Sequence, residues 1–121
     1  MSAILIVDDS ASIRQTVKIS LSGLGHVVTE AKDGSEGLSK AKTARFDLVI
    51  TDLNMPVMDG LSMIKAMRTL PTYAGVPIVF LTTESDAGIK SQAKSAGATG
   101  WITKPFDAEQ LCRIATKVLA K

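Results

Sequence analysis

Short apolar runs alternate regularly with longer helical patterns along the 121-residue chain. The apolar runs are mostly β-branched or aromatic and too short to be helices. They cover residues 4–7, 27–29, 48–50, 78–81 and 101–102. Three of the runs are apolar at successive positions, which is typical of strands that helices cover on both faces. We therefore predict five strands in a parallel sheet.

The segments between these runs predict helices. The first helix can begin with Ser10 or Ser12 as its N-cap and is expected to end at Gly25, with one apolar face made of Ile13, Val17, Leu21 and Leu24. Asp107 and Gln110 resemble a capping box that opens a helix with the apolar residues Leu111, Ile114, Ala115 and Val118. Further helices are predicted over residues 35–44 and 86–96 and around Leu61, Ile64 and Met67. Strands that alternate with helices predict an α/β domain with a doubly wound sheet.

Length and composition exclude several classes of protein. The length predicts one domain. The formal net charge of +2 is small, and no basic stripe with interleaved aromatic residues points to nucleic acid. The longest apolar run, residues 76–81, is far shorter than the roughly 20 residues of a membrane helix. A single cysteine, Cys112, cannot form an internal disulfide. We expect a cytoplasmic protein without a membrane or nucleic-acid partner.

Reactive side chains follow the predicted strands at the point where each strand ends. In a doubly wound sheet this edge holds the ligand site. The residues there are Asp8, Asp9, Asp52, Thr82 and Lys104. Three converging carboxylates repel one another, and a divalent cation held by oxygen ligands, such as Mg²⁺, would resolve that repulsion. The lysine and the threonine hydroxyl suit a phosphoryl group, and an aspartate can act as the nucleophile that forms an acyl phosphate.

These residues resemble those of a known family. Asp8 and Asp9, the segment TDLNMPVMDG at residues 51–60, Thr82, and the sequence KPF at residues 104–106 are similar to the receiver domain of bacterial two-component response regulators. The resemblance spans the whole chain and is strongest to the chemotaxis receivers that stand alone. It implies a flavodoxin-like strand order 2-1-3-4-5 with helices on both faces. It also implies that residues 1–121 form one receiver domain without an output domain.

The resemblance implies a role for each site residue. Asp52 would accept a phosphoryl group from a histidine kinase, and Lys104 would contact a phosphoryl oxygen. Thr82 would move toward another oxygen of that group. Mg²⁺ would be held by Asp8, Asp9, Asp52 and the backbone carbonyl of Asn54. Positions 54 and 84, here Asn54 and Glu84, influence in this family how quickly the phosphoryl group is lost.

An output surface is also implied by the resemblance. The shift of Thr82 would change the rotamer of the aromatic residue at position 101, and with it the surface of the fourth helix, fifth strand and fifth helix. That aromatic residue is usually Tyr or Phe, whereas this chain has Trp101. Lys90, Lys94, Arg113 and Lys117 would make the surface basic. A cis peptide bond before Pro105 is expected as well.

The leading prediction is a phosphorylation-switched binding module, not an enzyme beyond its own phosphotransfer and autodephosphorylation. Its partners would be a chemotaxis-type histidine kinase and a flagellar switch protein or phosphatase, and the chain would be a monomer. One alternative is a phosphorelay intermediate that passes phosphate to a histidine phosphotransfer protein. A more distant alternative is an aspartyl-phosphate phosphohydrolase, but that class has a second aspartate where this chain has Asn54.

Overall fold

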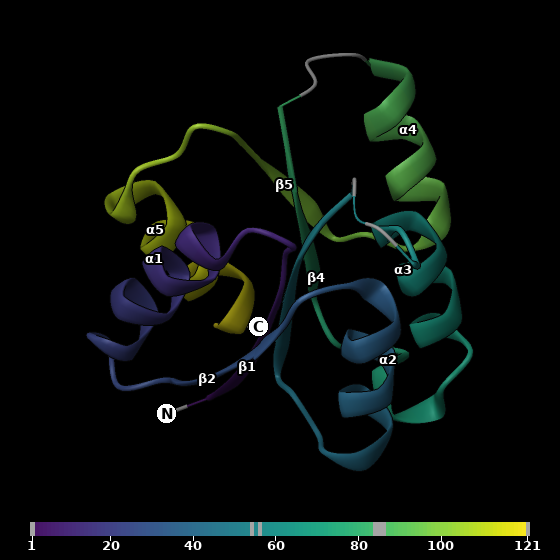
Figure 1. The fold of residues 1–121 in the computed structure, drawn as a ribbon, viewed down its shortest axis with the longest axis horizontal. Helices are drawn as coiled ribbons and strands as arrows, with labels where there is room; N and C mark the ends of the chain where they lie inside the picture. The colour runs from purple at the N-terminus through teal and green to yellow at the C-terminus, as the bar shows by residue number, and fades with distance from the viewer. Residues whose placement is uncertain (1, 54, 56, 84–86, 121) are drawn as a thin grey trace.

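A parallel sheet with the strand order β2-β1-β3-β4-β5 forms the centre of the molecule (Figure 1). The structure is a computed structural model that describes residues 2–53, 55, 57–83 and 87–120. The strands are β1 (Ala3–Val7), β2 (Val27–Ala31), β3 (Leu48–Asp52), β4 (Ile78–Thr82) and β5 (Gly100–Thr103). The helices are α1 (Ala11–Ser22), α2 (Gly34–Thr43), α3 (Gly60–Arg68), α4 (Ala87–Ala96) and α5 (Ala108–Leu119), with a short 3₁₀ turn at Pro71–Tyr73. The predicted fold class and strand order are confirmed.

Helices cover both faces of the sheet, with α1 and α5 on one side and α2, α3 and α4 on the other (Figure 1). Successive side chains of a strand point to opposite faces. In β1, Ile4 and Ile6 belong to the core beneath α1 and α5, whereas Leu5 and Val7 belong to the core beneath the other helices. This explains why the strand sequences are apolar at successive positions. No helix in the described part of the chain is long and apolar enough to cross a membrane.

The helix boundaries refine the sequence-based expectations. Ser10, and not Ser12, is the N-cap of α1, because its side chain accepts a hydrogen bond from the backbone N–H of Ile13. The expected end of this helix was wrong: α1 ends at Ser22, and Leu24 lies beyond it with 49% of its surface exposed. The chain leaves the helix and turns at Gly25, whose φ of +89° favours glycine.

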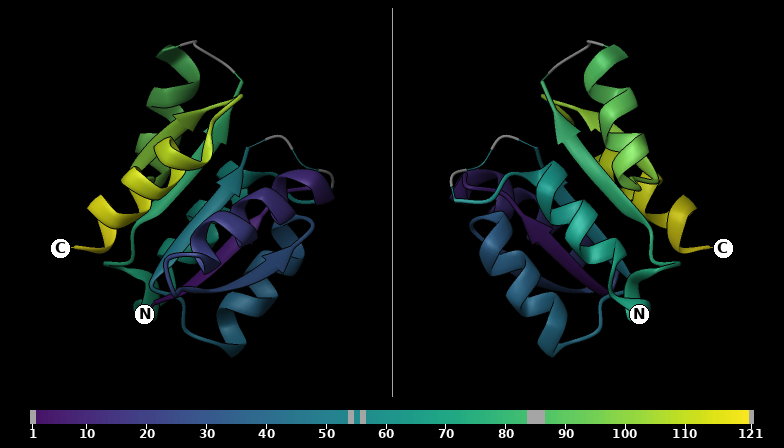
Figure 2. Two further views of the ribbon diagram at one scale, coloured as in Figure 1. Left: turned by 90° about the vertical axis from the view of Figure 1, so that its left-hand side faces the viewer. Right: turned by 90° about the vertical axis from the view of Figure 1, so that its right-hand side faces the viewer.

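All five strands point toward the same end of the molecule, and the two chain ends lie toward the other (Figure 2). β3 and β4 run two residues and one residue beyond the predicted runs at 48–50 and 78–81, so Asp52 and Thr82 are the last residues of these strands and do not follow them. Both side chains are still at the carboxyl edge of the sheet. The fold therefore brings residues from distant parts of the chain to one edge.

Candidate functional site

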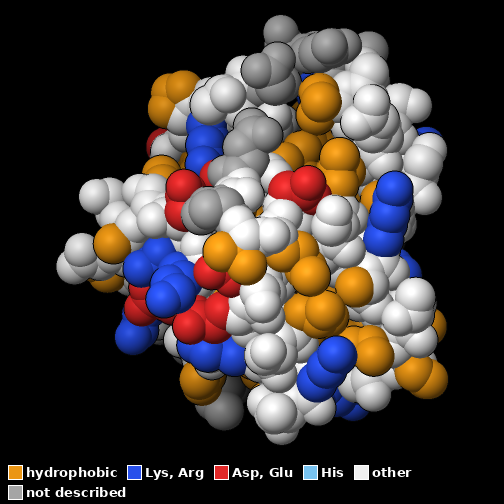
Figure 3. Space-filling view, turned by 45° about the vertical axis from the view of Figure 1, so that its right-hand side comes forward, with side chains coloured by type: hydrophobic (Ala, Val, Ile, Leu, Met, Phe, Trp, Pro, Cys, Tyr) orange, Lys and Arg blue, Asp and Glu red, His pale blue; other side chains and the backbone are white. Residues whose placement is uncertain are grey.

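Three carboxylates converge where β1 and β3 end. The two strands are neighbours in the sheet, and their register pairs Val7 with Thr51, so the residues that follow come side by side. One carboxylate oxygen from each of Asp8, Asp9 and Asp52 lies within 4.8 Å of the other two. Asp8 is fully buried, Asp52 is buried, and Asp9 is exposed. The cluster is thus closed on the protein side and open to solvent at Asp9. In Figure 3, acidic side chains reach the surface with Lys and Arg side chains beside them.

Lys104 connects this cluster to the far edge of the sheet. Its ammonium nitrogen lies 3.1 Å from Oδ2 of Asp8 and 3.4 Å from Oδ2 of Asp52. Its backbone N–H donates a 2.8 Å hydrogen bond to the carbonyl oxygen of Thr82, which fixes the lysine just beyond β5. The Lys104–Pro105 peptide bond is cis, as the family resemblance implies. One cation therefore bridges two carboxylates that come from different strands.

The electrostatic environment of Asp52 is unfavourable to its charge. Burial raises the pKa of this carboxyl above its ordinary value, and the negative charge of Asp8 raises it further. The Lys104 ammonium and the backbone N–H of Leu53, which donates a 2.8 Å hydrogen bond to Oδ1, act in the opposite direction. The pKa remains raised, so the contacts with Lys104 and Leu53 do not offset burial and the charge of Asp8.

The donor set fits a hard divalent cation. The three carboxylates and the single ammonium of Lys104 sum to two negative charges, which a divalent ion would neutralise. All the side-chain ligands are oxygen atoms, the type that Mg²⁺, Ca²⁺ and Mn²⁺ prefer. The exposure of Asp9 also leaves room for water or a phosphate oxygen in the coordination shell. The structure thus brings together the acidic residues that the sequence predicted for a metal site.

Thr82 and Trp101 lie on the same side of the sheet as α4. Thr82 is 3% exposed, and two residues before it Phe80 pairs in register with Trp101 of β5. The rings of Phe80 and Trp101 are 6.2 Å apart between centroids. The indole is 47% exposed, so it points outward, and the Lys90 ammonium lies 4.7 Å from its centroid in a cation–π contact.

The remaining predicted residues are divided between surface positions and undescribed ones. Lys94 lines a pocket of about 380 Å³ together with Phe80, Lys90 and Trp101. Arg113 pairs with Glu109 on the same helix, and both side chains are well exposed. Lys117 is exposed on α5. Two residues of the sequence-based prediction, Asn54 and Glu84, lie outside the described residues.

Two residues near the site were missed by the sequence reasoning. Arg14 of α1 donates a hydrogen bond to the backbone carbonyl of Asp8. Gly60 is packed so closely that a Cβ at this position would lie 2.1 Å from the carbonyl oxygen of Asp52. For Arg14, the available signal was a basic residue one turn into the helix that follows Asp8 and Asp9. For Gly60, it was a glycine at the first position of a helix, where the backbone conformation does not require glycine.

Comparison with known proteins agrees with this geometry. The family model for the response regulator receiver domain matches residues 4–116. The chemotaxis protein CheY of Pseudomonas aeruginosa is 34% identical over 119 residues, covering 98% of this chain and 96% of that protein. The gliding motility regulatory protein of Myxococcus xanthus is 35% identical over 101 residues, but the match covers 84% of this chain and only 13% of that protein.

The solved structures lead to the same family. The chemotaxis response regulator CheY4 of Vibrio cholerae matches with a TM-score of 0.94 and 47% sequence identity, and 98% of each chain is covered. The shared strand order places the aspartates of β1 and β3 side by side at the carboxyl edge, where doubly wound folds bind their ligands. Since the family model covers nearly the whole chain and the fold agrees throughout, this chain belongs to the response regulator receiver domain family.

Proposed function

We propose that this protein is a phosphorylation-activated response regulator in which Asp52 accepts a phosphoryl group from a histidine kinase. The observation that carries the proposal is the cluster of Asp8, Asp9 and Asp52, in which the Lys104 ammonium pairs with Asp8 and Asp52 and leaves a net charge of about −2 for a divalent ion. A carboxylate oxygen of Asp52 attacks phosphorus, the bond between phosphorus and the histidine nitrogen breaks, and the imidazole leaves. The product is an acyl phosphate.

The side chains of this chain have distinct tasks in that reaction. Bound Mg²⁺ would be held by Asp8, Asp9 and Asp52, and it would neutralise charge on the phosphoryl oxygens. Lys104 exchanges its contact with the Asp52 carboxylate for a phosphoryl oxygen. Thr82 offers its hydroxyl to another oxygen from the end of β4. The chain modifies only itself, once per signalling cycle, and turns over no metabolite.

Mg²⁺-dependent phosphorylation tests this proposal. Incubation with acetyl phosphate and Mg²⁺ is expected to add the mass of one phosphoryl group to the intact protein, and peptide mapping is expected to find it on Asp52. Chelation of Mg²⁺ with EDTA is expected to prevent the addition, since the three carboxylates then repel the incoming phosphate. Wild-type protein that gains no phosphoryl group, or gains it equally in EDTA, would contradict the proposal.

We propose that the surface formed by Trp101, Lys90 and Lys94 binds the partner protein that receives the signal. The pocket between these side chains has an apolar floor that includes Phe80 and a positively charged rim. Such a surface fits an acidic segment that carries an apolar anchor residue. Relatives named as chemotaxis proteins favour a flagellar switch protein as the partner. A histidine phosphotransfer protein would be the partner if the chain served in a phosphorelay.

A pull-down with purified flagellar switch protein tests this surface. Beryllofluoride with Mg²⁺, which mimics the phosphorylated state, is expected to increase binding. Trp101→Ala and Lys90→Ala are expected to weaken it about tenfold or more, as for residues at the centre of an interface. Lys42→Ala, at an exposed position of α2, serves as the control and should bind like wild type. If the switch protein is not retained and a histidine phosphotransfer protein is, the phosphorelay alternative holds.

A further inference from the structure

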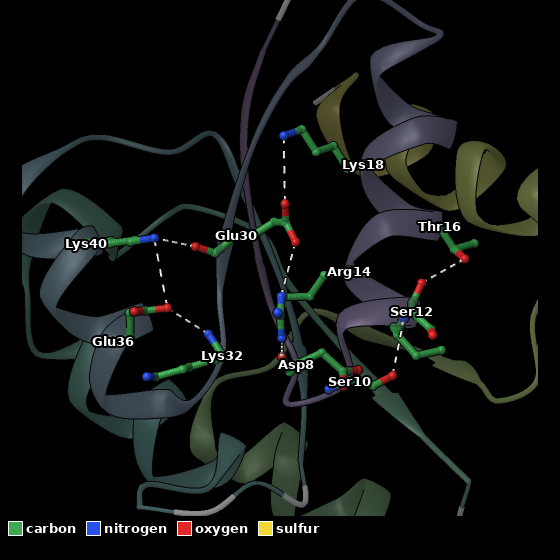
Figure 4. A network of polar contacts seen from close by, with 11 residues as sticks. Asp8, Ser10, Ser12, Arg14, Thr16, Lys18, Glu30, Lys32, Glu36 and Lys40 are labelled. Atoms are coloured by element: carbon green, nitrogen blue, oxygen red, sulfur yellow. Dashed lines mark hydrogen bonds and ion pairs between the residues drawn. The ribbon is translucent and has the colours of Figure 1, made fainter.

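Arg14 links the candidate metal site to the edge strand of the sheet (Figure 4). Its Nη1 donates a 2.6 Å hydrogen bond to the backbone carbonyl of Asp8. Its Nε donates to Oε1 of Glu30 on β2 at 3.1 Å. The Arg14 side chain is only 17% exposed, so the planar guanidinium is held between the two acceptors. Arg14 therefore connects helix α1, the end of β1 and strand β2.

The contact with Asp8 fixes one particular peptide group. The Asp8 carbonyl belongs to the peptide that joins Asp8 to Asp9, so its orientation fixes the Asp9 Cα, from which the Asp9 carboxylate projects. The Asp8 carboxylate has further restraints, from the backbone N–H of Ser10 at 2.9 Å and from Lys104 at 3.1 Å. Asp9, in contrast, is exposed. The position of the Asp9 carboxylate thus depends more on this peptide than that of Asp8 does.

The charge of Arg14 does not favour a cation at the site. A guanidinium close to the cluster repels a cation, so on electrostatic grounds alone it would weaken metal binding. Glu30 offsets part of this charge, since its carboxylate accepts a hydrogen bond from Arg14. The same carboxylate also lies 3.8 Å from the ammonium of Lys18. The position of Arg14 is therefore explained by geometry, because its rigid guanidinium holds the Asp8 carbonyl and the Glu30 carboxylate at the same time.

We propose that Arg14, oriented by Glu30, is a positioning residue for the divalent cation. By holding the peptide between Asp8 and Asp9, it keeps the Asp9 carboxylate within reach of an ion shared with Asp8 and Asp52. This inference rests on the proposed function, because it concerns the same metal site. Residues that orient metal ligands typically change metal affinity by about 10–100-fold when they are replaced.

The direct test is Mg²⁺ binding to the Arg14→Lys variant, measured by isothermal titration calorimetry with the metal alone. Lysine keeps the charge but lacks the planar fork, so the dissociation constant is expected to rise about tenfold. A second result is also expected: the Mg²⁺ concentration for half-maximal phosphorylation by acetyl phosphate should rise by the same factor, while the rate at saturating Mg²⁺ stays unchanged. A purely structural role of Arg14 would not produce this second result.

A charge-matched pair separates geometry from electrostatics. Arg14→Met and Lys18→Met each remove one positive charge next to Glu30, but only Arg14 contacts Asp8. Electrostatics alone predicts tighter Mg²⁺ binding in both variants. The proposal predicts weaker binding in Arg14→Met than in Lys18→Met. Equal affinities in the two variants, or wild-type affinity in Arg14→Lys, would overturn it.

Folding and the proposed function are controlled separately. Thermal unfolding in EDTA reports whether each variant folds, and Glu30→Gln, which removes the charge that orients Arg14, is a second variant that leaves the guanidinium in place. Glu30→Gln is expected to weaken Mg²⁺ binding in the same direction. Absence of Mg²⁺ binding in the wild type would reject the proposed function itself. Normal wild-type binding with no effect in any Arg14 or Glu30 variant would reject only the positioning role.

Discussion

Replacing Asp52 by asparagine is expected to abolish phosphorylation and, in the same molecule, to raise thermal stability. The amide of Asn has no nucleophilic carboxylate oxygen, so acetyl phosphate and Mg²⁺ should add no phosphoryl group. Stability should increase because the buried charge that Asp8 repels is removed, while the Asn oxygen can still accept the N–H of Leu53. A gain of about 1 kcal/mol in the free energy of unfolding at neutral pH is expected.

The pH dependence of this gain follows from the raised pKa of Asp52. Between the ordinary pKa of 3.8 and the raised folded value, the folded chain holds a proton that the unfolded chain has lost. Wild-type stability therefore falls as the pH rises through this interval, and the advantage of Asp52→Asn grows from near zero at lower pH to a plateau above it. Urea unfolding at several pH values, without Mg²⁺, measures this difference.

Asp107→Asn is the matched control for Asp52→Asn. Asp107 caps α5 far along the chain, and asparagine caps helices about as well as aspartate, so phosphorylation and stability should both stay near wild type, within about 0.5 kcal/mol. Addition of Mg²⁺ should narrow the stability difference between wild type and Asp52→Asn, because the ion relieves the repulsion in the wild type alone. A destabilised Asp52→Asn variant, or one that still gains a phosphoryl group, would contradict the assignment.

The second large effect is expected for Gly60→Ala. A Cβ at this position would lie 2.1 Å from the carbonyl oxygen of Asp52 and 2.8 Å from the Cα of Leu53. Both neighbours are backbone atoms and cannot rotate away, so β3 or α3 must shift. We expect a loss of about 3 kcal/mol in the free energy of unfolding. Phosphorylation should also slow in the absence of denaturant, since the carbonyl that must move belongs to Asp52, the proposed phosphoacceptor.

Gly75→Ala is the control for this substitution. Among the residues that the structure describes, no atom beyond the chain neighbours lies within 4 Å of the Cβ that would be added at Gly75, and the φ of Gly75 is not in the left-handed region. Its stability should remain within about 0.5 kcal/mol of wild type. Chemical denaturation of the two variants in parallel measures both effects. If Gly60→Ala unfolds at the same denaturant concentration as Gly75→Ala, the close approach of Gly60 to the Asp52 carbonyl does not require glycine, which would contradict the prediction.

The sequence was sufficient for the sheet and for the meeting of the acidic residues. Continuous apolar runs identify buried parallel strands, and parallel strands necessarily bring their carboxyl ends to one edge, so Asp8 and Asp52 could be placed together without coordinates. Strand order came from the family resemblance. The predicted ends of β2, β3, β4 and β5 were one or two residues too early, since a polar side chain such as Thr82 can complete a strand as readily as follow it.

Contacts that depend on how helices, strands and loops pack against one another could not be predicted from the sequence. The contact of Arg14 with Asp8 depends on how α1 lies against β2, and an arginine on a helix usually indicates an exposed surface. The close approach of Gly60 depends on the path of the loop after β3, which no periodicity describes. The outward position of Trp101 follows from its contacts with Phe80 and Lys90, which pattern analysis cannot assign.

The ion pair between Lys104 and Asp8 joins residues that are 96 positions apart in the chain. A contact between such distant residues closes a long loop, and the entropy of closing that loop is lost before the contact stabilises the fold. A partly folded molecule in which β5 has not yet joined the sheet lacks the lysine that completes the site. Under the proposed function, the ability to accept a phosphoryl group is thereby coupled to completion of folding.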